Sequence, residues 1–466
     1  MDMNDNTLRI HFIGIGGAGM GAIASILLDR GFPVSGSDVA DHEHTRQLRE
    51  RGALVYLGHD RQHVEDVDVV VYSTAIASDN EELQAAKDRH LPVLHRSQML
   101  AELMQEGYGI AIAGAHGKTT TTSMVAWVLE QAGLDPTFLV GGISANFNMS
   151  AKVGKGKHIV AEADESDGSF LNYLPMIEVV TNIEADHLEH YQGSFANLVA
   201  AYQKFVSLLS PEGLLVASLD DEVVAQLLPD LQTRVLTYTL HHQDADYQAE
   251  NVRFVGHGTV SSIYFRDTYL GELELAIPGV HNVGNAMAAI AVANEVGIDF
   301  LTAVKALKEF RGALRRFQVL YDHDDILLVD DYAHHPTEIR AMIRAAKETK
   351  RRVVAVFQPQ RYTRTFHLFE DFARAFADAD DVIIVDIYSP AGEMPIAGVS
   401  AKRLVDAVRK ESHVEAKFYA TKDEVVEYLS ERVKPGDLVL FMGAGDIWKA
   451  GRMLAEQLET ESTRLG

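Results

Sequence analysis

The sequence contains no cysteine, and this absence removes several kinds of chemistry at once. Disulfide bonds, thiolate metal sites and cysteine nucleophiles are all excluded. The amino-terminal residues also lack the apolar segment that a signal peptide or a membrane span requires. We therefore expect a cytoplasmic protein that does not enter a membrane.

Positive charge is scarce as well. The chain has 42 lysine and arginine residues against 67 aspartate and glutamate residues, a formal net charge of -25 at pH 7. Such a surface repels nucleic acids and anionic membranes, so neither is an expected partner. Any anionic substrate has to be held by a local group of cations. The sequence leaves the oligomeric state open between a monomer and a homodimer.

Short apolar runs alternate with helical patterns along the 466 residues, of which 47% are hydrophobic. This alternation is typical of parallel sheets with crossover helices, and it starts anew three times. We predict an α/β protein of three domains. A Rossmann-like domain spans 1–107, a central domain with a mostly parallel sheet spans 108–318, and a second Rossmann-like domain spans 319–466.

The first apolar run ends in the glycine loop "GIGGAGM", which fits the pattern Gly-x-Gly-x-x-Gly. Asp38 closes the next predicted strand, where this pattern places an acid on a ribose. A glycine loop at a helix amino terminus binds any diphosphate, so NAD and a UDP-sugar fit it equally well. The candidate ligand contacts of this domain are Gly14, Gly16, Gly17, Ala18, Gly19, Asp38, Ser73 and Thr74.

A second glycine loop, "GAHGKTTTT", is a shortened Gly-x-x-x-x-Gly-Lys-[Ser/Thr] motif, because Ile112 stands where the first glycine belongs. Gly117 allows backbone amides to approach phosphate oxygens, and Lys118 supplies a positive charge. Thr119 offers a hydroxyl to a magnesium ion, and a helix is predicted over 122–133. These features predict that the central domain is a P-loop ATPase domain.

Acidic residues and a histidine follow two further strands of the central domain. Glu162 ends the strand "HIVAE" and is followed by Asp164 and Glu165, while His187 follows the strand in "VVTNIEADH". Magnesium prefers oxygen ligands and keeps several waters, so one hydroxyl, one carboxylate and the nucleotide phosphates suffice for a first ion. A histidine beside a second ion is less usual. The acids and His187 are therefore candidates for holding phosphate-bound metal ions.

Three more polar clusters are candidates for binding or catalysis. "VHNVGNAM" places Asn282 and Asn285 on the first turns of a helix, where their amides suit an adenine edge. Arg315 lies at the junction with the third domain and suits a phosphate clamp. "DDYAHHP" gathers Asp330, His334 and His335 at a strand end, just before a helix predicted to start at Pro336.

Together these motifs resemble the Mur ligase family. The resemblance is carried by "GIGGAGM", "GAHGKTTTT", "EADESD", "TNIEADH", "PGVHNVGNAMAA", "RRF", "DDYAHHPTEI" and "GAGDIWK", which follow the family's order from residue 14 to residue 449. It implies an ATP- and Mg²⁺-dependent ligase of peptidoglycan precursor synthesis. The implied reaction joins L-alanine to the carboxylate of UDP-N-acetylmuramate, with the three domains holding the UDP part, ATP and the amino acid in that order.

The resemblance also implies roles for individual residues. Those implied to contact ATP are Gly114, Ala115, His116, Gly117, Lys118, Thr119, Thr120, Asn282, Asn285 and Asp330. Those implied to hold metal ions are Thr119, Glu162 and His187. Those implied to take part in catalysis are Lys118, Glu162, His187, Arg315, His334 and His335. The lysine that several sister enzymes carbamylate has no recognisable motif in this chain.

Two alternatives remain open at this stage. A relative within the family joins a preformed tripeptide to the same sugar nucleotide, although "EADESDGSF" favours a single amino acid. The interpretation as an NAD-dependent oxidoreductase is supported by "GIGGAGM" alone, and it gives the second glycine loop no function. The residue types fit a ligase because a carboxylate attacks a phosphate without any protein nucleophile, so that catalysis becomes positioning and charge neutralisation.

Overall fold

The computed structural model of the chain describes residues 5–41, 43–105, 107–229, 231–241, 244–256, 258–389 and 393–465. The chain forms two compact units. The first consists of Met1–Asn251, Ser261–Glu274 and Asn282–Arg311, and the second of Val252–Val260, Leu275–His281 and Gly312–Gly466.

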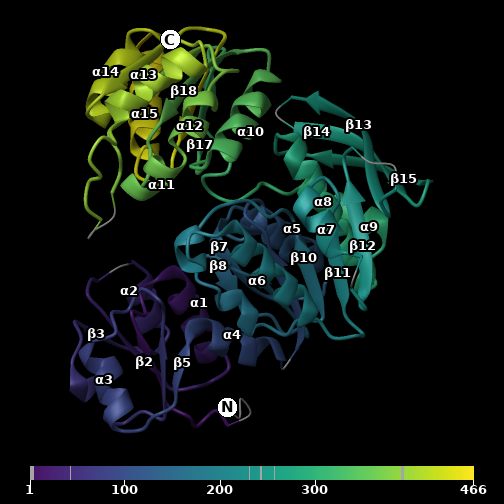
Figure 1. The fold of residues 1–466 in the computed structure, drawn as a ribbon, viewed down its shortest axis with the longest axis vertical. Coiled ribbons are helices and arrows are strands. Elements are labelled where there is room, and N and C mark those ends of the chain that lie inside the picture. Colours follow the sequence, from purple (N-terminus) through teal and green to yellow (C-terminus); the bar gives the residue numbers. More distant parts are fainter. Residues whose placement is uncertain are drawn as a thin grey trace. The chain divides into compact units, whose positions relative to one another are not determined.

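The amino-terminal residues form a five-stranded parallel sheet whose strand order, β3-β2-β1-β4-β5, is that of a Rossmann-like domain (Figure 1). Its strands are β1 (Ile10–Ile13), β2 (Val34–Asp38), β3 (Leu54–Leu57), β4 (Val69–Tyr72) and β5 (Val93–His95). Its helices are α1 (Ala18–Asp29), α2 (Glu43–Glu50), η1 (Arg61–Val64), α3 (Glu81–Asp88) and α4 (Arg96–Gln105).

A ten-stranded sheet forms the middle of the chain, in the order β15-β14-β13-β12-β11-β10-β6-β9-β7-β8. The strands are β6 (Tyr108–Ala113), β7 (Thr137–Ser144), β8 (Met149–Lys152), β9 (His158–Glu162), β10 (Ile177–Val180), β11 (Leu214–Ser218), β12 (Arg234–Thr239), β13 (Tyr247–Val255), β14 (Gly258–Phe265) and β15 (Thr268–Leu275). The helical segments are α5 (Lys118–Gln131), η2 (Ser169–Asn172), η3 (Leu188–Tyr191), α6 (Phe195–Ser207), α7 (Glu222–Leu227), α8 (Val280–Glu295) and α9 (Phe300–Lys308). The pairs from β7 through β9, β6, β10, β11 and β12 to β13 are parallel, whereas β7 and β8 are antiparallel.

The carboxyl-terminal residues form a six-stranded sheet in the order β16-β17-β21-β18-β19-β20, in which only the β16–β17 pair is antiparallel. The strands are β16 (Gln318–His323), β17 (Ile326–Asp331), β18 (Arg352–Phe357), β19 (Asp381–Val385), β20 (Ala416–Tyr419) and β21 (Asp437–Met442). The helices are α10 (Pro336–Lys347), α11 (Tyr362–His367), α12 (Phe369–Arg374), α13 (Ala401–Glu411), α14 (Lys422–Ser430) and α15 (Trp448–Leu465). The sequence therefore predicted the α/β class and the three mostly parallel sheets correctly.

Two local features differ from the sequence prediction. Helix α5 begins at Lys118, four residues before the predicted start at Thr122, because the threonines that lower helix propensity are buried against the sheet. Strand β3 was not predicted, and its leucines Leu54 and Leu57 are 57% and 66% exposed at the edge of the first sheet. Such an edge strand lacks the alternating pattern that marks a half-buried strand.

Within the described residues, no helix combines the length and apolar character needed to cross a membrane.

Three histidines surround one fully buried carboxylate in the amino-terminal part of the chain. Glu82, on α3, receives contacts from His63 Nδ1 at 2.6 Å, His59 Nδ1 at 3.0 Å and His11 Nε2 at 3.7 Å. The Ser37 hydroxyl donates to the same carboxylate at 2.5 Å. Burial acts to raise the pKa of Glu82, but the nearby His11 and the hydrogen bonds from Ser37 and His63 outweigh it and lower this pKa to about 2.

This cluster makes the stability of the protein depend on pH on the acid side. Because the folded-state pKa of Glu82 is depressed, its contribution is present above the unfolded value near 4.5 and is lost as the pH falls towards 2. We expect Glu82→Gln to cost about 3 kcal/mol at pH 7 and less than half of that at pH 3. Urea unfolding at several pH values, with the exposed neighbour Glu81→Gln as the control, measures this difference. A cost for Glu82→Gln that does not change with pH contradicts the assignment.

Candidate active site

The first glycine loop joins β1 to α1, as the sequence predicted. Gly14 has a left-handed backbone with φ +79°, and Gly17 precedes the helix without any side chain capping its first amides. Gly16 N donates to Asp38 Oδ2 at 2.8 Å, so Asp38 at the end of β2 fixes the shape of the loop. The uncapped helix terminus can bind an anion.

Arg96 is a candidate ligand contact that the sequence did not reveal. A Cβ atom added to Gly19 would lie 3.3 Å from Arg96 Nη1, so the guanidinium lies directly against the first turn of α1. The same side chain lies 3.7 Å from Asp164 Oδ2. Arg96 begins α4, about 80 residues after the loop, and no local motif marks it. It is thus a positive charge that lies beside the first glycine loop.

Ser73 and Thr74 follow β4 and lie near the acidic loop of the central sheet. The Thr74 hydroxyl donates to Asp167 Oδ2 at 2.5 Å and lies 3.1 Å from His95 Nε2. Ser73 accepts a hydrogen bond from the Ile76 amide through its carbonyl oxygen. Thr74 is thus held by a residue of the "EADESD" segment, which couples the two predicted binding regions.

The second glycine loop joins β6 to α5 and is held by the end of β10. The amides of Ala115 and His116 donate to the main-chain and side-chain oxygens of Asn182, at 3.0 and 2.8 Å. The Thr181 hydroxyl and the Asn182 amide both donate to the His116 carbonyl oxygen, at 2.6 and 3.0 Å. The amides of Ala115 and His116 are therefore engaged within the protein, which leaves Gly117 and the first turn of α5 to meet a phosphate.

The fit to a nucleotide phosphate rests on the amino terminus of α5. Gly117 has φ +84°, no side chain caps the helix, and a Cβ atom at Gly117 would lie 2.7 Å from Asn285 Oδ1. Only glycine fits there. Asn285 in turn donates from Nδ2 to Asn282 Oδ1 at 3.1 Å, and both amides are buried. The structure thus brings the predicted adenine-reading helix α8 against the phosphate loop.

The structure also joins two of the predicted metal ligands. The Thr119 hydroxyl donates to Glu162 Oε2 at 2.9 Å, and the Gly141 amide donates to the same oxygen at 2.8 Å. Burial raises the pKa of Glu162, while the nearby Lys118 opposes that rise. A hydroxyl and a carboxylate in contact at a phosphate loop are the protein ligands that Mg²⁺ accepts, so these residues fit the ion.

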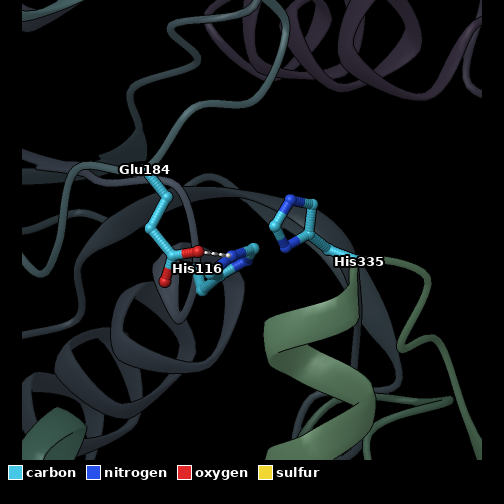
Figure 2. Close-up of side chains that lie close together, drawn as sticks. All are labelled: His116, Glu184 and His335. Carbon is cyan, nitrogen blue, oxygen red and sulfur yellow. Dashed lines mark ion pairs between the residues drawn. The ribbon is translucent and has the colours of Figure 1, made fainter. Parts of the chain in front are cut away.

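The third predicted ligand, His187, has a left-handed backbone with φ +53°, and its Nε2 lies 3.5 Å from Asp186 Oδ2. Its role as a ligand of a second ion stays a prediction. A different histidine, His116 of the phosphate loop, lies 3.5 Å from Glu184 Oε2 (Figure 2). Glu184 was not among the predicted site residues, because a lone glutamate after a strand carries no signal in one sequence.

The predicted residues of the third sheet form a separate network. Arg315 has φ +62°, and its guanidinium donates to Asp330 Oδ2 at 3.1 Å and to the carbonyl oxygens of Gly443 and Gly445 at 2.5 and 3.1 Å. Burial raises the pKa of Asp330 against the opposing charge of Arg315. Arg315 thus ties the start of β16 to the "GAGD" loop, which is a positioning role within this unit.

The two histidines before α10 have different hydrogen-bond roles. His335 is the N-cap of α10, and its Nδ1 accepts the Thr337 amide at 3.4 Å (Figure 2). His334 Nδ1 lies 3.0 Å from the Tyr332 carbonyl oxygen and 3.3 Å from Glu338 Oε2. Because both of these partners are acceptors, Nδ1 of His334 carries a proton.

Two anion-binding loops at helix amino termini, one of them with a lysine, a threonine and a buried carboxylate, define a nucleotide-dependent α/β enzyme. Three family models match the chain in succession: "Mur ligase family, catalytic domain" over 9–108, "Mur ligase middle domain" over 112–293 and "Mur ligase, glutamate ligase domain" over 315–445. The chain belongs to the Mur ligase family, a family of ATP-dependent enzymes. The resemblance seen in the sequence is confirmed.

Individual relatives agree with this assignment. The UDP-N-acetylmuramate–L-alanine ligase of Pelotomaculum thermopropionicum is 50% identical over 99% of this chain and 100% of its own. The enzyme of the same name from Geotalea uraniireducens is 47% identical over 97% and 98%. The crystal structure of UDP-N-acetylmuramate–alanine ligase MurC from Thermotoga maritima has a TM-score of 0.80 and 31% identity, and the match covers 97% of this chain and 100% of that one.

The pairing of Thr119 with Glu162 leads to a specific expectation. We expect Glu162→Gln to lower turnover by about 100-fold and to raise the Mg²⁺ concentration needed for half-maximal rate, because an amide is a poor ligand for this ion. Steady-state rates across a Mg²⁺ titration measure both effects, and the exposed Glu212→Gln is the control. Unchanged Mg²⁺ dependence in Glu162→Gln contradicts the ligand assignment.

Proposed function

We propose that this chain joins L-alanine to the carboxylate of UDP-N-acetylmuramate and converts ATP to ADP and phosphate, in the cytoplasm. The observation that carries the proposal is the match over whole chains to ligases of this name at 47–50% identity. The phosphate loop with Lys118, Thr119 and Glu162 gives this reaction its ATP site. Residues 1–107, 108–318 and 319–466 are proposed to bind the UDP part, ATP and L-alanine respectively.

The proposed reaction has two steps. An oxygen of the substrate carboxylate attacks the γ-phosphorus of ATP, and the bond from this phosphorus to the β-phosphate oxygen breaks. The products of this step are ADP and an acyl phosphate. The amine nitrogen of L-alanine then attacks the acyl carbon. The bond between this carbon and the phosphate oxygen breaks, and phosphate leaves. Bound Mg²⁺, held by Thr119 and Glu162, would neutralise phosphate charge. Lys118 and the first amides of α5 orient the phosphates, and Arg96 with the first turn of α1 holds the sugar nucleotide.

The amine has to lose a proton before it forms the amide. His334 suits this role better than His335, because the Nδ1 of His335 is engaged in capping α10, whereas the Nδ1 of His334 donates to the Tyr332 carbonyl oxygen. The Nδ1 lone pair of His335 already accepts the Thr337 amide at the start of α10. We therefore propose His334 as the general base, and His335 as the residue that fixes the helix start beside it.

The relative that attaches a preformed tripeptide is the second candidate within the family. A crystal structure of the murein peptide ligase Mpl from Psychrobacter arcticus has a TM-score of 0.68 and 26% identity, over 97% of this chain and 98% of that one. This identity is well below the 47–50% of the L-alanine ligases, which favours the single amino acid. The oxidoreductase alternative is wrong, because the family match covers both glycine loops.

The proposal predicts a strict dependence on both substrates. Phosphate release from ATP should require UDP-N-acetylmuramate and L-alanine together, because the acyl phosphate forms only on a bound carboxylate. A coupled phosphate assay with L-alanine, other single amino acids and the tripeptide tests this expectation. Comparable turnover without the sugar nucleotide excludes the ligase reaction, and a preference for the tripeptide favours the second candidate.

The roles of the two histidines can be separated by variants. We expect His334→Gln to lower kcat by about 100-fold or more and to remove the acidic limb of the pH–rate profile, because the proton acceptor is lost. His335→Asn keeps a side-chain acceptor at the N-cap, so it should lose less than about tenfold and keep the profile. Rates of both variants measured from pH 5 to pH 9 show which histidine accepts the proton. The opposite ranking of the two variants assigns the base to His335.

A further inference from the structure

The ammonium group of Lys118 already has all of its hydrogen-bond donors engaged within the protein. Its Nζ donates to the two carboxylate oxygens of Glu165, at 2.8 and 3.0 Å, and to the Gly114 carbonyl oxygen at 2.6 Å. A fourth acceptor, the Ala115 carbonyl oxygen, lies 3.4 Å from Nζ, so the three protons of the ammonium are all engaged within the protein. The two side chains are 12% and 3% exposed, so water contributes little to the pair.

Glu165 is held independently of Lys118. The buried Tyr191 hydroxyl donates to the Glu165 carbonyl oxygen at 2.5 Å, and the Gly168 amide donates to the same oxygen at 3.0 Å. These bonds fix the main chain behind the carboxylate from η3 and from the following turn. The main chain at Glu165 therefore keeps its place whether or not the ammonium stays on the carboxylate.

A nucleotide phosphate at this loop competes directly with Glu165. Burial acts to lower the pKa of Lys118, but the charges of Glu165, Glu162 and Asp164 outweigh it and raise this pKa above its ordinary value. Lys118 therefore stays charged. Its three protons cannot form all their hydrogen bonds to the Glu165 carboxylate and to the phosphate oxygens at the same time. The Gly114 bond can remain, since that carbonyl belongs to the loop itself.

We propose that Glu165 is a positioning residue that holds Lys118 in the nucleotide-free loop and yields the ammonium to the phosphates, so that its carboxylate limits the affinity for ATP. The inference rests on the ATP site of the proposed function. The task of Glu165 differs from that of Glu162. Glu162 accepts a hydrogen bond from the Thr119 hydroxyl, whereas Glu165 accepts hydrogen bonds from the lysine ammonium. The exchange keeps Lys118 charged and correctly aimed before the nucleotide arrives.

Calorimetric titration of the full chain with Mg-ADP tests the exchange. In Glu165→Gln the competing charge is gone, so the Kd for Mg-ADP and the KM for ATP should each fall five- to tenfold, roughly, while kcat stays within about threefold. Lys118 should also become more reactive towards acetic anhydride, read by peptide mass spectrometry. Glu130→Gln is the matched control. Glu130 lies on α5 like Lys118, and its carboxylate also pairs with a lysine, Lys152 of β8, whose Nζ is 2.6 Å away.

A second variant covers the case in which Glu165→Gln does not fold. Glu165→Asp keeps the charge but withdraws it by one methylene, so Mg-ADP should bind more tightly than to the wild type and less tightly than to Glu165→Gln. Equal or weaker Mg-ADP binding in the folded variants overturns the proposal, and so does a loss of kcat with unchanged KM for ATP. If the wild type binds Mg-ADP but lacks ligase activity, the proposed function fails while this titration still decides the role of Glu165.

Discussion

The contact between the phosphate loop and the end of strand β10 is the constraint on which the nucleotide site depends. Parallel pairing sets Ala113 opposite Val180, so Gly114 meets Thr181 where a Cβ atom would lie 2.0 Å from the hydroxyl oxygen. Thr181 and Asn182 then hold the next two loop residues by hydrogen bonds. A shift of β10 by one residue would turn these side chains to the other face and release the loop. The positions of Lys118 and Thr119 follow from this register.

The sequence predicted what local chemistry determines, and it missed what distant segments bring together. Both glycine loops, the helix at Pro336 and the strand ending in Glu162 carry short motifs, and each lies where its motif indicates. Arg96 and Asn182 carry no such motif, because their function arises only when α4 meets α1 and when β10 pairs with β6. Glu165 was visible as one acid among several neighbours. Spacing along the chain could not tell which of them faces the lysine.

The acidity of the chain has a counterpart inside the site. The charges of Glu165, Glu162 and Asp164 all act on the buried Lys118, so the carboxylates around the phosphate loop oppose the approach of a polyphosphate. A divalent cation reverses that balance, because it turns a repelling carboxylate into a ligand. The same acids that weaken the binding of a free nucleotide thereby favour its magnesium complex. Under the proposed function, this charge distribution would select the metal-bound form of the nucleotide.

The engagement of the Ala115 and His116 amides by Asn182 has a consequence for inhibitors. Nucleotide mimics designed for ordinary phosphate loops place oxygens along a continuous row of free amides. In this shortened loop that row begins only at Gly117, and Asn285 stands close beside it. A compound that fills this narrower donor set and also hydrogen-bonds to the Asn285 amide would match the geometry of this loop. Selectivity is therefore available from the backbone of the loop, without any contact to the less distinctive adenosine.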